Sequence, residues 1–302
     1  MDHAERPHEP QHAQELVPAQ AQALRDVGRR HLDEHDAERW AALIRPGVRL
    51  AVADEEWDAA ELPTAARLGG LPRLPDGTHW PTGPDGVPLA FVAAVDCAAL
   101  PAGSPDLPLP ADGTLAFFAS APPAAGRVLH IPAGVPGGVR PAPPGTAVFP
   151  AVRLIARPEC TAPFPDHPRV REAFGLHTPQ DLYEHPVYGQ SFLDELAEYG
   201  HRFEHRVGGC AVASGVPEYR AAAGPAGSPA VTDPAAATAR DIARALEWVL
   251  LAQFHHEPAE GMLGHPDDPA PAGRRRGALI WLIREEDLTR GDFDAAVLVP
   301  RF

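Results

Sequence analysis

The stretch Arg67-Leu68-Gly69-Gly70-Leu71-Pro72 precedes two apolar runs of strand length, Leu89 to Val95 and Leu115 to Ala119. A similar order recurs near the other end of the chain, where Arg206-Val207-Gly208-Gly209 precedes the apolar runs Val249 to Phe254 and Ala278 to Ile283. Paired glycines permit backbone conformations that residues with a Cβ atom avoid, or the close approach of another segment. We therefore interpret both glycine pairs, Gly69-Gly70 and Gly208-Gly209, as structural turns in a fold built from two degenerate repeats.

The connections between these runs favour an α+β fold with a mainly antiparallel sheet. The chain has 302 residues and 37 prolines, which imply many loops and few long helices. Strand candidates joined by irregular loops, rather than by regular helices, indicate antiparallel pairing instead of a doubly wound parallel sheet. Further strands are expected at residues 127–131, 147–155 and 296–299.

The expected organisation is one domain over residues 14–302, preceded by a polar segment, residues 1–13, that we expect to be disordered. The domain is divided into N-terminal helices (14–47), repeat one (48–120), linking strands and helices (121–204) and repeat two (205–302). Within repeat two, the Ala/Pro/Gly-rich residues 221–237 have the composition of a flexible insertion.

Charge and composition exclude several classes of partner. The net charge of −15 argues against nucleic-acid binding, which requires a positive surface, and against an anionic membrane surface. No apolar stretch approaches the ~20 residues that a membrane span needs. Three cysteines without a C-x-x-C motif, and an N-terminus without the pattern of a signal peptide, indicate reduced thiols in the cytoplasm. The acidic balance suits a soluble protein or one that binds a basic protein partner.

Common catalytic and cofactor motifs are missing. The chain contains no lysine, so no phosphate-binding loop of the G-x-x-x-x-G-K-[ST] type can be formed around Gly69-Gly70. The G-x-S-x-G motif of many serine hydrolases is missing as well. We therefore expect no cofactor and favour a non-enzymatic role.

Several segments together resemble a known family. They are Gly69-Gly70-Leu71-Pro72-x-Leu74-Pro75, Trp80-Pro81, Gly86-x-Pro88-Leu89-x-Phe91-x-Ala93-x-Val95-Asp96, Pro110-x-Asp112-Gly113-x-Leu115-x-Phe117-Phe118, His205-Arg206-Val207-Gly208-Gly209, Leu250-Leu251-Ala252-Gln253-Phe254 and Ile283-Arg284-Glu285-Glu286-Asp287-Leu288. On these residues the sequence, from about 49 to 300, resembles the YwqG-like family, a bacterial group defined as domain of unknown function 1963.

The resemblance implies an α+β fold and a cytoplasmic bacterial protein, and it implies no established reaction. Some members of the family are thought to act as immunity proteins beside polymorphic toxins. The second half departs from the family pattern, because Cys210-Ala211 stands where an aromatic residue and a proline are usual, and His255-His256-Glu257 replaces an acidic pair. A non-enzymatic interaction protein, in the manner of an immunity partner of a toxin, is therefore our first hypothesis.

The second hypothesis is a hydrolase or another enzyme with a pocket near Trp80, Asp96 and His205, which would have to converge on one concave surface. Each of these residues also has a structural interpretation. A tryptophan beside a proline turn is more often a core plug. Asp96 follows a buried strand and is placed to cap the turn Cys97-Ala98-Ala99. His205 precedes a glycine pair and is expected to form a hydrogen bond with that turn.

The third hypothesis is zinc binding through His201 and His205, because His201-Arg202-Phe203-Glu204-His205 matches H-x-x-E-H. A second match, His31-Leu32-Asp33-Glu34-His35, lies in a strongly charged segment. We interpret it as a solvated helix face, because such short motifs need a structural context.

Overall fold

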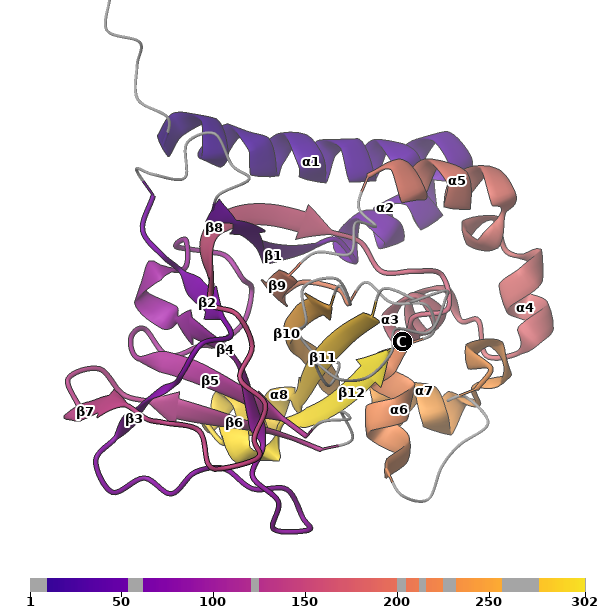
Figure 1. Ribbon diagram of the computed structural model, residues 1–302. Helices are drawn as coiled ribbons and strands as arrows, with labels where there is room; N and C mark the ends of the chain where they lie inside the picture. The colour runs from indigo at the N-terminus through magenta and orange to yellow at the C-terminus, as the bar shows by residue number, and fades with distance from the viewer. Residues whose placement is uncertain are drawn as a thin grey trace, which may run out of the picture.

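The structure is a computed structural model that describes residues 10–53, 62–120, 125–199, 205–211, 216–224, 232–256 and 277–301 (Figure 1). Within these ranges, ten strands form one antiparallel sheet in the order β12–β11–β10–β9–β1–β8–β2–β4–β5–β6. Their bounds are β1 Arg45–Val52, β2 Ala66–Leu68, β4 Ala90–Asp96, β5 Thr114–Ala119, β6 Gly126–Ile131, β8 Val152–Thr161, β9 His205–Gly208, β10 Trp248–His256, β11 Gly277–Arg284 and β12 Val297–Arg301. A separate pair joins β3 Arg73–Pro75 to β7 Gly137–Val139.

Helices lie outside the large sheet. They are α1 Pro10–His31, α2 Glu34–Ala42, α3 Pro168–Phe174, α4 Pro179–Glu184, α5 Gln190–Glu198, α6 Pro217–Ala223, α7 Ala239–Ala245 and α8 Glu285–Thr289. The predicted α+β class with a large antiparallel sheet and an N-terminal helix is therefore confirmed.

The large sheet curls around a single apolar core. Its edge strands β6 and β12 contact each other, and a Cβ atom on Gly126 would lie 2.7 Å from the Cβ atom of Leu298. Each of the ten strands contributes inward-facing residues to this core. At its centre, the rings of Phe117, Phe254 and Trp281 pack edge to face with centroids 5.1–5.7 Å apart.

A helical layer with a core of its own packs against β8. Trp40 and Phe192, both fully buried, meet edge to face at 4.9 Å, and the indole nitrogen of Trp40 donates to the carbonyl of Leu24. Helix α1 contacts β8, and the apolar cluster includes Cys160 from that strand. Figure 1 shows α1, α2 and α5 together at one end of the molecule, away from the small β3–β7 pair.

The strand order is mirrored on either side of the central β1–β8 pair. We call β1, β2, β4, β5 and β6 the first unit, and β8, β9, β10, β11 and β12 the second unit. The register shifts between Phe91 and Ala93 in β4 and between Leu250 and Ala252 in β10, so the bulges fall at corresponding points. Both glycine pairs have positive φ, 56° and 70° in the first unit and 65° and 71° in the second. The two units share these features, but β8 lies in the predicted linking segment (121–204) and outside the predicted repeat two (205–302), so the repeat stays a prediction.

Some boundaries differ from those that the sequence predicted. Helix α1 begins at Pro10, inside the segment expected to be disordered, while residues 1–9 lie outside the described ranges. The expected strand at 147–155 is displaced to Val152–Thr161 because a proline-rich loop continues to residue 151.

The flexible insertion expected at 221–237 begins inside α6, whose residues Ala221, Ala222 and Ala223 are buried. Small alanine side chains let this helix pack closely against β10, β11 and β12. No described helix is long and apolar enough to cross a membrane.

Candidate functional site

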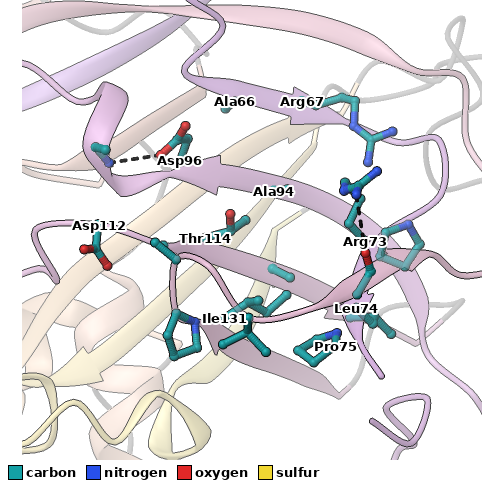
Figure 2. A pocket seen from close by; sticks show the side chains of 18 of the residues that line it. Ala66, Arg67, Arg73, Leu74, Pro75, Ala94, Asp96, Asp112, Thr114 and Ile131 are labelled. Carbon is teal, nitrogen blue, oxygen red and sulfur yellow. Dashed lines mark hydrogen bonds between the residues drawn. The ribbon is translucent and has the colours of Figure 1, made fainter. Parts of the chain in front are cut away.

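A cavity of about 570 Å³ lies on the outer face of the first unit, against β2, β4 and β5 (Figure 2). The small β3–β7 pair and the segment that follows β6 form its other wall. Figure 2 shows Arg67 and Arg73 at one end of the cavity and Asp96 and Asp112 at the other. A cavity of this size falls in the range typical of small-molecule sites.

The arginine end is built by the first glycine turn. Arg67 points outward from β2, its Nη2 atom donates to the carbonyl of Leu71 at 2.6 Å, and its guanidinium lies 5.6 Å from the ring centroid of Phe91. Gly70 leaves the necessary room, because a Cβ atom there would lie 2.7 Å from Nη1 of Arg67. Arg73 comes from β3 and donates to the carbonyl of Gly137 at 3.4 Å.

The two guanidinium groups form a positive end of the cavity. Burial lowers the pKa of Arg67, and the nearby charge of Arg73 lowers it further, although arginine stays protonated in proteins. Among the described residues, neither side chain forms an ion pair with a carboxylate. Two such cations favour a carboxylate or phosphate group, which guanidinium binds through charge-assisted hydrogen bonds.

The aspartate end lies where β4 stops and β5 begins. Asp96 accepts a hydrogen bond from the backbone N–H of Ala98 at 3.0 Å, which confirms its predicted role as the cap of Cys97–Ala99. Its partner in the β4–β5 register is Thr114, which also lines the cavity. Asp112 belongs to the loop before β5, and both aspartates are exposed. In the described part of the chain, neither carboxylate forms an ion pair.

The surface between the two charged ends is apolar. The sheet contributes Phe91, Ala94 and Ala116, and the opposite wall contributes Leu74 and Ile131. Small alanines on the sheet keep this face hollow. The cavity therefore separates a positive end from a negative end by an apolar middle.

Trp80 packs beside the cavity without lining it. Its ring meets that of Phe118 edge to face at 5.8 Å, and its Nε1 atom donates to the carbonyl of Leu89 at 2.8 Å. Its side chain joins the apolar cluster formed by Leu74, Leu89 and Phe118, in keeping with its interpretation as a core plug.

His205 lies on β9, with its ring 6.3 Å from that of Phe254 in the inner core. Its Nδ1 atom accepts a hydrogen bond from the backbone N–H of His255 at 2.9 Å. The predicted hydrogen bond to the glycine turn is therefore wrong, because the partner is β10. Burial, with a smaller contribution from the nearby His255, lowers the pKa of His205 to about 4, so the imidazole is neutral at pH 7.

The structure does not bring Trp80, Asp96 and His205 to one surface. Asp96 lines the outer cavity, whereas His205 faces the inner core of the curled sheet. Strands β2, β8 and β1 lie between β4 and β9 in the sheet order. The pocket that the enzyme hypothesis requires is therefore not formed by these three residues.

The histidine motifs do not form a described metal site. His201 lies outside the described residues, and within the described ranges no three His, Cys, Asp or Glu side chains are grouped to hold a metal ion. His31 ends α1, while His35 belongs to α2. The expected solvated face is wrong for His31, because its Nε2 atom lies 2.6 Å from a carboxylate oxygen of Glu195.

The corresponding face of the second unit is covered. Arg206 occupies the place of Arg67, and its Nη1 atom donates to the carbonyl of Cys210 at 3.1 Å across Gly208-Gly209. Arg206 is 1% exposed, and its Nε atom lies 3.5 Å from Oε1 of Glu159. Helices α6 and α7 pack over β10, β11 and β12. The two units thus share the arginine–glycine turn, but the open cavity lies on the first.

Sequence reasoning identified Asp96 but missed Arg67, Arg73 and Asp112 as site residues. Arg67 directly precedes the glycine pair, and Asp112 lies in one of the motifs of the family resemblance. The sequence context of these two residues could therefore have marked them as candidates for the site. The contribution of Arg73 depends on the β3–β7 pairing, which no local pattern predicted.

Comparison with protein families gives one match. The model of Domain of unknown function (DUF1963) matches residues 66–128, which confirms the resemblance over that range. The matched range contains β2, β4 and β5 with Arg67, Asp96 and Asp112, so the family-matched segment supplies both ends of the cavity. A search of curated proteins found no match.

Proposed function

We propose that this chain is a non-enzymatic binding protein, whose first-unit cavity binds an acidic group of a small molecule through Arg67 and Arg73. The observation that carries the proposal is the pair of guanidinium groups at one end of a 570 Å³ cavity, without a carboxylate partner among the described residues. Two like charges in one place repel each other, and a bound anion would relieve that repulsion. Because Arg67 is already oriented by Leu71, little side-chain entropy would be lost on binding.

No reaction is part of this proposal. Asp96 is engaged as a turn cap, and His205 lies on the other face of the sheet, so the site has no described base beside a nucleophile. The location that we propose is the cytoplasm, which agrees with three buried free cysteines in the described ranges.

The test uses carboxylate probes with a variant that keeps the fold. Arg73 is exposed and makes one long hydrogen bond, so Arg73→Ala should fold normally. The probe is caproate, a six-carbon acid without an amine, titrated by calorimetry or by chemical-shift changes. Loss of one charge-assisted contact should weaken binding roughly tenfold or more.

Arg240→Ala is the matched control, because Arg240 is exposed on α7 and its removal changes the net charge equally. Saturable binding in the wild type and in Arg240→Ala, with weak binding in Arg73→Ala, would support the proposal. Equal binding of caproate to all three proteins, or to none, would refute it.

A basic protein partner is a second candidate function, favoured by the net charge of −15 and by two exposed valines, one in the lining of the cavity and one on β7. Val135, which lines the cavity, is 44% exposed, and Val139 on β7 is 56% exposed. A double variant, Val135→Ser with Val139→Ser, should lose a stoichiometric partner that the wild-type protein captures from its native host. Capture of the same partner by the double variant would count against this surface.

A further inference from the structure

The aspartate end of the cavity has no role in binding an acidic group, and it would repel one. Asp96 and Asp112 line the same cavity as Arg67 and Arg73 and face it from the opposite end (Figure 2). None of these four side chains forms an ion pair within the described ranges. The cavity therefore has two poles of opposite charge that do not neutralise each other.

The geometry of the sheet explains why the poles stay apart. In the β2–β4 register Arg67 pairs with Ala94, so Asp96 lies two residues further along β4 on the same face. A direct contact across such a diagonal is open to long side chains. Here the hydrogen bond from Arg67 to Leu71 draws the guanidinium toward the glycine turn, and the hydrogen bond from Ala98 holds Asp96 at its own turn.

We propose that the ligand is amphoteric: a small molecule with an acidic group at Arg67 and Arg73 and a basic group, separated by an apolar spacer, at Asp96 and Asp112. This inference extends the proposed function, because it uses the same cavity and the same arginine end. An ammonium or guanidinium group would be held by two carboxylates, with Thr114 as a neutral neighbour that can also accept a hydrogen bond. The spacer would contact Ala94, Ala116 and Ile131.

Exclusion of other ligands follows from the same arrangement. A purely acidic molecule that reached both ends would place negative charge beside two aspartates, and a purely basic one would place positive charge beside two arginines. A compact zwitterion such as glycine could occupy one pole but would leave the other without a partner. The cavity thus selects for length as well as for charge.

The experiment compares four probes by calorimetric titration of the full chain. They are ε-aminocaproate (acid, spacer and amine), caproate (acid only), hexylamine (amine only) and glycine (both groups without the spacer). We expect ε-aminocaproate to bind at least tenfold more tightly than caproate, and glycine and hexylamine to bind more weakly still. A wild-type protein that binds caproate as tightly as ε-aminocaproate would overturn the inference.

The variants assign this preference to the aspartates. Asp96→Asn keeps an oxygen that can accept the hydrogen bond from Ala98, so the turn should survive, and Asp112→Asn changes an exposed loop residue. In the double variant the preference for ε-aminocaproate over caproate should fall to less than about twofold, while binding of caproate itself is kept or strengthened. Glu172→Gln on α3, an exposed carboxylate far from the cavity in sequence, is the control for charge and should keep the preference.

The outcomes separate the two proposals. A preference that survives in the double aspartate variant would overturn the amphoteric inference and leave the acid-binding function standing. Binding of caproate and ε-aminocaproate that is equally insensitive to Arg73→Ala would instead overturn the proposed function.

Discussion

The Nη2 atom of Arg67 lies 2.6 Å from the carbonyl oxygen of Leu71, so a hydrogen bond joins the arginine that precedes the glycine turn to the residue that follows it. Arg206 and Cys210 repeat this relationship in the second unit, at 3.1 Å. Each turn needs two consecutive residues with positive φ, which glycine adopts without a Cβ penalty. The glycine pair thus determines where the guanidinium of Arg67 lies, and through it the positive end of the cavity.

Replacement of Gly69 by alanine should be strongly destabilising. Gly69 has φ 56°, and a Cβ atom there would lie 2.1 Å from the carbonyl oxygen of Pro150. The left-handed conformation alone costs about 1–2 kcal/mol for a residue with a Cβ atom, and the backbone contact adds to it. We expect Gly69→Ala to reduce the free energy of unfolding, measured in urea, by more than about 3 kcal/mol.

Gly77→Ala is the matched control for this substitution. Gly77 has φ 79°, but a Cβ atom there would meet nothing within 4 Å. Gly77→Ala should therefore reduce the free energy of unfolding only by the conformational cost, about 1–2 kcal/mol. Similar losses in the two variants would show that the contact with Pro150 is unimportant.

Acidification should destabilise the protein through His205. Burial lowers the pKa of this imidazole from 6.5 to about 4, so the unfolded chain binds a proton at a higher pH than the folded chain does. The stabilising effect is present above pH 6.5 and is lost as the pH falls from about 6.5 to about 4. A shift of this size corresponds to roughly 3 kcal/mol.

The measurement is the free energy of unfolding in urea at several pH values between 7 and 4, for the wild type and for His205→Gln. Carboxylates titrate in both proteins, so their contribution cancels in the difference between the two curves. The wild type should lose more stability than the variant over this interval. Parallel curves would mean that His205 takes up its proton equally well in the folded state.

Four strands could be predicted because most of their residues are buried on both faces. Strands β4, β5, β10 and β11 are nearly continuous apolar runs, which is the pattern of a strand covered on both sides. The capping box of α4, in which the side chains of Thr178 and Asp181 accept hydrogen bonds from each other's backbone N–H, is likewise a feature of local sequence.

Short elements escaped prediction because tertiary contacts define them. Strands β2 and β9 have three and four residues and contain an arginine each, so their sequences resemble loops. Helix α6 was hidden in an alanine-rich stretch that composition alone assigns to a flexible segment.

The candidate site was predictable only in part for the same reason. Asp96 was found because it follows a long strand, whereas Arg73 reaches the cavity through the pairing of β3 with β7, more than sixty residues away in the chain. No periodicity or spacing encodes that approach. His205 was assigned to the wrong surface because a four-residue strand gives no pattern that separates its inner and outer faces.

Truncation of Phe117 should test the single core of the curled sheet. Its ring is fully buried between Phe254 of β10 and Trp281 of β11, so it joins the two units. Phe117→Ala should reduce the free energy of unfolding by about 3–5 kcal/mol, because the surrounding side chains can relax only partly into the cavity that the ring leaves. Val139→Ala, at an exposed position on β7, should change stability by less than about 0.5 kcal/mol. Two separate unfolding transitions in Phe117→Ala would contradict a shared core.

The two corresponding arginines should respond differently to the same substitution. Arg206 is 1% exposed, donates to Cys210 and lies beside the buried carboxylate of Glu159, so Arg206→Ala removes one partner of a buried ion pair. Such a loss costs about 3–5 kcal/mol. Arg67 is only partly buried and has no ion-pair partner among the described residues, so Arg67→Ala should cost about 1 kcal/mol through its hydrogen bond to Leu71.

Binding of caproate should show the reverse order, with a large loss in Arg67→Ala and none in any folded Arg206→Ala protein. Equal losses of stability in the two variants would contradict the division between a structural arginine in the covered second unit and a binding arginine in the open first unit.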